Sequence, residues 1–221
     1  IGQITTLANN APDTLFIIDE AFVDFMPGAA SYRHERPNNV LSLCSLTKTY
    51  AIPGLRLGVA FGAPVLMAAI QALLPPWSVN TLAQRVGIEI CKDDSFLQPT
   101  QAYVSQERAF LQQGLAQAGP YETFPSQANF LLVRLTSQDG KASHLAERLI
   151  RYGIAIRVCD NFPGLDDRYF RIAVRTREEN ERLLDALKTM SFGRPPKTRA
   201  LRTPSIMFQG TGSNAGKSVL A

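Results

Sequence analysis

The sequence predicts an α/β protein whose short buried strands alternate with helices and form a parallel sheet. Two largely apolar runs indicate the strands: residues 15–18, bounded by polar residues, and residues 39–44. Such runs are typical of parallel strands buried on both faces. A third observation is residues 95–118, whose helix-favouring composition and apolar spacing of three and four predict one long helix.

Residues 45–58 follow the second run directly and hold one lysine among small and apolar residues. At a strand end, Lys48 is expected to lie on a loop, partly desolvated, with a lowered pKa. Its amine could then attack a carbonyl and form a Schiff base. Ser45 and Arg56 are suited to bind phosphate, one as a hydroxyl donor and the other as a bidentate fork. A lysine-reactive aldehyde that carries a phosphate is pyridoxal 5′-phosphate.

Plainer interpretations stand beside these. A lysine near a strand end is usually a solvated charge, and an arginine after Pro-Gly is usually a surface residue. Asp19, at the end of the first run, would ordinarily be a helix cap or a loop residue. Beside a pyridoxal lysine, its carboxylate could instead pair with the pyridine nitrogen and keep that nitrogen protonated.

Residues 45–58 resemble the cofactor-lysine signature of fold-type I pyridoxal-phosphate enzymes in the aspartate aminotransferase superfamily, and residues 19–22 resemble the setting of that family's aspartate. The resemblance implies the later part of a large parallel-sheet domain followed by a small α+β domain. Many relatives have a tyrosine in place of Phe22, and its hydroxyl bonds the cofactor's ring oxygen, which Phe22 cannot do. The implied cofactor site consists of Lys48 and Asp19, both catalytic, with Ser45 and Arg56.

Further strands and helices follow from apolar periodicity. In the first part of the chain we expect a strand at 59–62 and helices at 65–74 and 81–91. In the later part we expect strands at 128–133, 154–157 and 169–175, and helices at 144–152 and 178–190. The predicted domains are residues 1–95, the remainder of the large domain, and 96–192, the small domain.

Two arginines of the small domain indicate an anion site. Arg171 alternates with Ala173 and Arg175, so the three side chains would share one face of a strand. Polar residues on such strands most often face solvent, but here two cations have little acidic company. In the resembled family an arginine at the position of Arg171 holds the substrate α-carboxylate. Arg157 matches the arginine that binds substrate phosphate.

Residues 18–25, 77–80 and 156–171 resemble the L-threonine-O-3-phosphate decarboxylase family of cobalamin biosynthesis, whose near relatives are histidinol-phosphate aminotransferases. The resemblance implies decarboxylation of a phosphorylated amino acid to aminopropanol phosphate by a homodimer. Two alternatives stay open. One is an aminotransferase of a phosphorylated amine, which Phe22 disfavours, and the other is an inactive fragment of a bifunctional protein.

The end of the chain has a separate signature. Residues 193–203 are rich in proline and basic residues and are predicted to be a linker. Residues 204–209 form an expected strand before a G-x-x-x-x-G-K-S pattern, which resembles the start of cobyric acid synthases. A flexible Gly/Ser tail is the alternative. The partial nucleotide-binding motif consists of Gly210, Gly216, Lys217 and Ser218.

Composition excludes several other classes. Of 221 residues 45% are hydrophobic and 19% charged, as in ordinary globular proteins. The net charge of +4 is scattered, which disfavours nucleic acid and favours anionic small molecules. With two histidines and three cysteines without metal spacing, we expect no metal site. No apolar run is long enough to cross a bilayer, so we expect no membrane partner and a cytoplasmic protein. Because the chain starts at Ile1 without methionine and stops within an apparent helix start, we expect a fragment.

Overall fold

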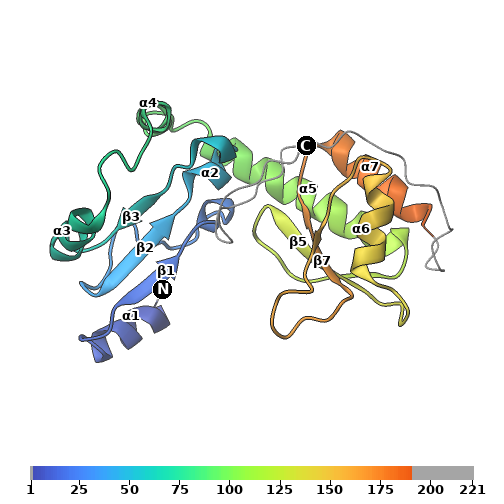
Figure 1. Ribbon diagram of the computed structural model, residues 1–221, viewed down its shortest axis with the longest axis horizontal. Helices are drawn as coiled ribbons and strands as arrows, with labels where there is room; N and C mark the ends of the chain where they lie inside the picture. Colours follow the sequence, from blue (N-terminus) through green and yellow to red (C-terminus); the bar gives the residue numbers. More distant parts are fainter. Residues whose placement is uncertain (1, 191–221) are drawn as a thin grey trace.

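The computed structural model describes residues 2–190, which form two parts joined by one long helix (Figure 1). The first part contains a three-stranded sheet and the second a four-stranded sheet. Helix α5 (Leu97–Ala118) runs between them and is the long helix predicted for residues 95–118. The domain boundaries proposed from the sequence stay predictions.

Parallel pairing organises the first sheet. β1 (Phe16–Asp19) and β2 (Val40–Cys44) are parallel, and β3 (Val59–Phe61) adds antiparallel to β2. Asp19 pairs with Leu43 in the register, so the carboxyl ends of β1 and β2 reach the same edge. The strands predicted at 15–18 and 39–44 are therefore confirmed. This edge is where α/β sheets place their site residues.

One face of this sheet is covered and the other is largely open. Phe16 and Ile18 pack against the cluster that Tyr32 forms with helix α1 (Gly2–Asn10). On the opposite face, Ile17 is 59% exposed. The prediction that this strand is buried on both faces is wrong, because side chains alternate along a strand and the described residues cover one side alone.

Helix α2 (Leu46–Thr49) precedes β3 in the chain, and helices α3 (Pro64–Leu73) and α4 (Thr81–Ile90) follow it. The last two confirm the helices predicted at 65–74 and 81–91. α4 begins where Asn80 Oδ1 accepts a hydrogen bond from the Ala83 N–H at 2.9 Å. α3 buries none of its residues among the described parts of the chain, although it is strongly apolar.

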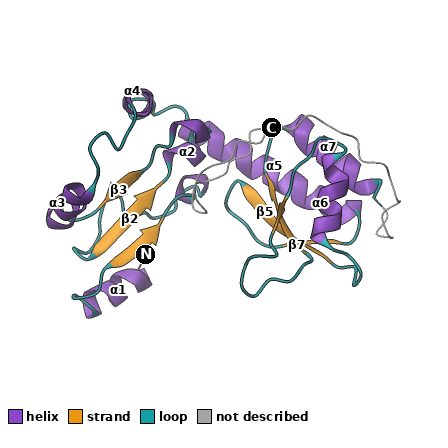
Figure 2. Ribbon diagram, in the orientation of Figure 1, coloured by secondary structure: helices purple, strands orange, loops and turns teal. Residues whose placement is uncertain are grey.

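The second sheet is antiparallel, in the order β4-β5-β7-β6. Helices α5, α6 (Ala142–Ile150) and α7 (Arg177–Lys188) cover one of its faces and enclose the main core (Figure 2). The predicted helices and strands are present with shifted ends, and one three-residue strand was not predicted. The strands are β4 (Tyr121–Thr123), β5 (Phe130–Leu135), β6 (Arg157–Val158) and β7 (Tyr169–Ala173).

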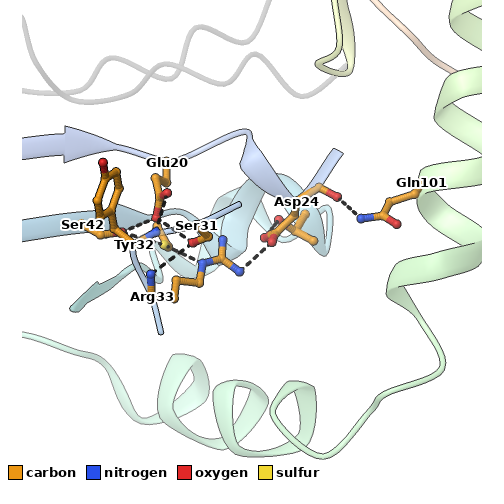
Figure 3. A network of polar contacts seen from close by, with 9 residues as sticks. Glu20, Asp24, Ser31, Tyr32, Arg33, Ser42 and Gln101 are labelled. Carbon is orange, nitrogen blue, oxygen red and sulfur yellow. Dashed lines mark hydrogen bonds and ion pairs between the residues drawn. The ribbon is translucent and has the colours of Figure 1, made fainter. Parts of the chain in front are cut away.

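The segment between β1 and β2 is held by buried polar contacts (Figure 3). Glu20, only 7% exposed, accepts hydrogen bonds from the Tyr32 N–H at 3.0 Å and from the Ser31 hydroxyl at 2.9 Å. The Ser42 hydroxyl of β2 donates to the same carboxylate. A buried carboxylate requires such donors, since an unpaired charge inside a protein is costly. The network fixes residues 31 and 32 against the sheet.

Asp24 connects the same segment to helices α2 and α5. Its Oδ1 pairs with Arg33 Nη1 at 2.6 Å, and its Oδ2 accepts from the Thr49 hydroxyl of α2 at 2.7 Å. Gln101 of α5 donates to the Asp24 backbone carbonyl at 2.7 Å (Figure 3). A four-residue helix is too short to be stable alone. Asp24 therefore helps to hold α2 in place.

An ion pair with a buried carboxylate and a half-exposed guanidinium joins α5 to α7 in the second part. Glu107, 2% exposed, accepts from Arg177 Nη2 at 2.8 Å and from Asn180 Nδ2 at 2.9 Å. The hydrogen bond from Arg177 is the main reason that the pKa of the Glu107 carboxyl lies below its usual range. The charged form of this carboxyl is thus part of the folded structure.

None of the helices in residues 2–190 combines the length and the apolar character needed to span a bilayer. The predicted linker and the partial nucleotide-binding motif, Gly210, Gly216, Lys217 and Ser218, lie outside the described residues.

The variant Glu107→Gln should lower the free energy of unfolding by about 1–3 kcal/mol, because it removes charge-assisted hydrogen bonds from a buried carboxylate to Arg177, which is itself 43% exposed, and to Asn180. Since the folded-state pKa of Glu107 lies below the unfolded value, its stabilisation is complete above about pH 4.3 and is lost as the pH falls through the folded pKa. Urea denaturation at neutral and acid pH measures both effects. The matched control is Glu89→Gln, which breaks the exposed Glu89–Lys92 pair and should cost less than about 0.5 kcal/mol. Equal losses in the two variants would contradict this account.

The variant Thr49→Val should destabilise the protein by about 1–2 kcal/mol, because it keeps the side-chain shape but removes the donor to Asp24. Thr49→Ser keeps a hydroxyl and is the matched control. Urea denaturation compares the two. If valine proves as stable as serine, the Asp24 bond does not support α2.

Candidate active site

Asp19 stands at the end of β1 with one carboxylate oxygen available. Its side chain is exposed, and Oδ1 accepts from the Ala21 N–H at 2.9 Å. This bond is typical of an aspartate that turns the chain, which is the plainer role left open by the sequence. Oδ2 accepts no hydrogen bond from residues 2–190. The residue can therefore fill the loop role and still offer an oxygen to a ligand.

Lys48 lies on α2, directly after β2, and not on a loop as predicted. Its neighbours Thr47 and Thr49 are 6% and 3% exposed, whereas Lys48 itself is exposed. The expectation of a partly desolvated lysine is therefore wrong for the described residues. The physical reason is that Thr47 and Thr49 are buried on nearly opposite sides of the helix, with hydroxyl partners in Ser45 and Asp24, which leaves Lys48 on the side that faces solvent. Ser45 precedes the helix, and its hydroxyl lies 2.8 Å from that of Thr47.

Arg56 follows the short 3-10 helix η2 (Pro53–Leu55) in a left-handed conformation, with φ of 55°. Its Nη1 donates to the Pro53 carbonyl at 2.9 Å, and its side chain is exposed. Ala51 has φ of 51° in the same loop. Residues other than glycine rarely adopt this conformation, and strained backbone of this kind gathers at functional sites. The sequence contained no signal for it.

These four residues offer the groups that pyridoxal phosphate requires. An amine can take the aldehyde, a carboxylate can face the ring nitrogen, and a hydroxyl and a guanidinium can bind the phosphate. All four come from β1 or from the segment after β2, at the edge where these parallel strands end. The donor set of Asp19, Ser45, Lys48 and Arg56 therefore fits the cofactor expected from the sequence. Within residues 2–190, no group of histidine, cysteine or acidic residues is placed to hold a metal ion.

The second sheet brings the two predicted substrate arginines together. Arg157 of β6 and Arg171 of β7 are direct partners in the register, on the sheet face that the helices leave open. The Arg171 guanidinium lies over the Phe130 ring at 4.1 Å from the centroid, and its Nε is buried without a hydrogen-bond partner among the described residues. Arg157 Nη2 donates to Asn161 Oδ1 at 3.1 Å. No acidic side chain in residues 2–190 forms an ion pair with either arginine.

Arg175 does not join this pair, contrary to the prediction. β7 ends at Ala173, and Arg175 forms an ion pair with Glu179 of α7 at 2.7 Å. Cys159 is buried just beyond β6, and burial raises the pKa of its thiol. Because this thiol stays neutral, it does not offset the positive charge of Arg157 and Arg171.

A cavity of about 590 Å³ lies between the two parts of the chain. Asp19 and Phe22 line it from the first part, and Phe130 lines it from the second. Neither Lys48 nor the paired arginines are among its lining residues. The contribution of Phe130 could not be predicted from the sequence, because a phenylalanine in an apolar strand carries no local sign of a functional contact.

Comparison with known proteins gives the family. The profile of the aminotransferase class I and II family matches residues 1–187. The chain is 34% identical over 219 residues to the adenosylcobalamin biosynthesis bifunctional protein CobDQ of Leptospira interrogans, covering 99% of this chain and 25% of that protein. It is 40% identical over 183 residues to the threonine-phosphate decarboxylase of Salmonella typhimurium, covering 81% and 50%.

The structural comparison agrees. The crystal structure of L-threonine-O-3-phosphate decarboxylase from Porphyromonas gingivalis matches with a TM-score of 0.75 and 30% identity, over 85% of this chain and 58% of that one. Histidinol-phosphate aminotransferases are also similar to this chain. The chain spans half or less of the length of the first curated relatives that it matches. With a profile match over most of its residues, the chain belongs to the aminotransferase class I and II family.

Proposed function

We propose that this chain is part of a pyridoxal-phosphate-dependent decarboxylase that converts L-threonine O-3-phosphate to aminopropanol phosphate and carbon dioxide. The observation that carries the proposal is the pairing of Arg157 with Arg171. Like charges directly opposite each other on a sheet are destabilising, so such a pair favours bound anions. An amino acid phosphate supplies two anionic groups on one small molecule. Similarity to threonine-phosphate decarboxylases supports the same substrate.

Four residues hold the cofactor in this proposal. The Lys48 amine would bond its aldehyde carbon, and the Asp19 carboxylate would pair with its ring nitrogen and keep that nitrogen protonated. The Ser45 hydroxyl and the Arg56 guanidinium bind its phosphate. When bound, pyridoxal phosphate accepts the electron pair released at the substrate Cα.

The two paired arginines orient the substrate. Arg171 holds the α-carboxylate and Arg157 holds the phosphate, so both ends of the molecule are fixed. This orientation selects the bond between Cα and the carboxylate carbon as the one that breaks, and carbon dioxide leaves. A proton must then reach Cα, and the Lys48 amine is the candidate donor.

We also propose that the protein acts as a homodimer in the cytoplasm. Apolar side chains on α3 and in the turn after it are open in the described residues: Leu73 is 86% exposed and Trp77 is 94% exposed. Such a patch is typical of an interaction surface. Three free cysteines accord with a reducing compartment. Sedimentation of the full-length protein tests the dimer.

The variant Lys48→Ala should reduce carbon dioxide release from L-threonine O-3-phosphate by about 10³-fold or more, because it removes both the cofactor bond and the proton donor. The assay uses the full-length protein supplied with pyridoxal phosphate. Lys48→Arg keeps the positive charge and is the matched control, which should be equally inactive. Transfer of an amino group from histidinol phosphate by the wild-type protein, without carbon dioxide release, would establish an aminotransferase instead.

The variant Arg157→Gln should raise the KM for L-threonine O-3-phosphate by about 10- to 100-fold, the cost of losing charge-assisted hydrogen bonds to the phosphate. Its preference for the phosphorylated substrate over L-threonine should fall by the same factor. Arg151→Gln removes an exposed arginine after α6 and serves as control. An unchanged preference would assign the phosphate to another residue.

A further inference from the structure

The Arg171 side chain is oriented by an aromatic ring and not by hydrogen bonds. Its guanidinium lies 4.1 Å from the centroid of Phe130, within the range of a cation–π contact. It forms no ion pair or hydrogen bond with the described residues, and its buried Nε is unpartnered. In the register Leu132 stands opposite Arg171, and Phe130 is its neighbour two positions along β5 on the same face.

Other stacked arginines of the second part have a polar partner as well. Arg177 lies 3.8 Å from the Phe110 centroid, but Glu107 binds it. Arg134 lies 5.9 Å from the Tyr169 centroid and pairs with Glu122. For those arginines an acid fixes the guanidinium, whereas Arg171 relies on the ring beneath it.

The ring of Phe130 is itself held from the other part of the chain. Phe22 contacts it edge-on, with ring centroids 5.2 Å apart and an interplanar angle of 76°. This T-shaped arrangement is a favourable one for two aromatic rings. Phe22 stands three residues after Asp19, and its other ring neighbour is Phe25, which is 3% exposed. Two successive contacts, Phe22 with Phe130 and Phe130 with Arg171, thus connect the segment after β1 to the arginine on β7.

We propose that Phe130 is a positioning residue that holds Arg171 for the substrate α-carboxylate, and that Phe22 supports Phe130 from the strand that carries Asp19. The inference rests on the proposed function, since that function gives Arg171 its ligand. It adds a specificity role to two phenylalanines that the proposed chemistry does not otherwise use. A carboxylate-bearing ligand should depend on both rings, and a ligand without a carboxylate should not.

Titration calorimetry on the full-length protein supplied with pyridoxal phosphate tests this dependence, and every protein compared, the wild-type reference included, also carries Lys48→Ala so that the ligand is not decarboxylated. The two probes are L-threonine O-3-phosphate and O-phosphoethanolamine, which keeps the amine and the phosphate but has no carboxylate. Phe130→Leu should weaken binding of L-threonine O-3-phosphate about tenfold and binding of O-phosphoethanolamine less than about twofold. Phe22→Leu should act in the same direction, by about threefold. Phe130→Tyr keeps the aromatic face and should restore the wild-type ratio.

The outcomes separate this proposal from the proposed function. If the wild-type protein prefers the carboxylate ligand and Phe130→Leu weakens both ligands equally, or neither, the positioning role is overturned while the function stands. If the wild-type protein shows no preference for the carboxylate ligand, the proposed function fails and the positioning role fails with it. Should Phe130→Leu not fold, the ligand ratio measured for Phe22→Leu decides by the same criterion.

Discussion

The candidate site depends on the parallel pairing of β1 with β2. Parallel strands end at the same edge of a sheet, so Asp19 and the segment that carries Lys48 emerge side by side. Antiparallel pairing of the same two strands would have placed the carboxylate and the amine at opposite ends. The crossover that parallel pairing requires is the segment between residues 20 and 39, which is why that segment must itself be held firmly.

A buried acid, Glu20, and a largely buried one, Asp24, supply this support, because the elements at the site are too short to hold themselves. β1 and α2 have four residues each. Glu20 and Asp24 collect hydroxyl, amide and guanidinium donors from the crossover, from β2 and from α2. Each of the four oxygens of these two carboxylates accepts at least one donor, and a polar network of this kind specifies one arrangement where apolar packing would allow several.

Apolar periodicity was sufficient to predict most strands and helices, and it was insufficient to predict burial. It located β1, β2, α4 and α5 within about two residues, since these elements contain regular apolar spacing. It predicted Ile17 to be buried and Lys48 to be desolvated, and both are exposed. The exposure of Lys48 depends on the contacts that bury its neighbours, such as the bond from Thr49 to Asp24, 25 residues away in the chain. The contact between Phe22 and Phe130 joins distant segments, so no local pattern announces it.

Some arginines of the second part form ion pairs with acidic side chains, whereas Arg157 and Arg171 do not. This difference explains where an anion can bind. An arginine paired with an acid is neutralised and has a structural role. Arg157 and Arg171 keep their charge, face each other across two strands and lie over aromatic rings, which attract cations without neutralising them. The open face of the second sheet therefore retains concentrated positive charge, which draws an anionic small molecule toward it. The neutralised set consists of Arg134 with Glu122, Arg168 with Asp166, Arg175 with Glu179, and Arg177 with Glu107.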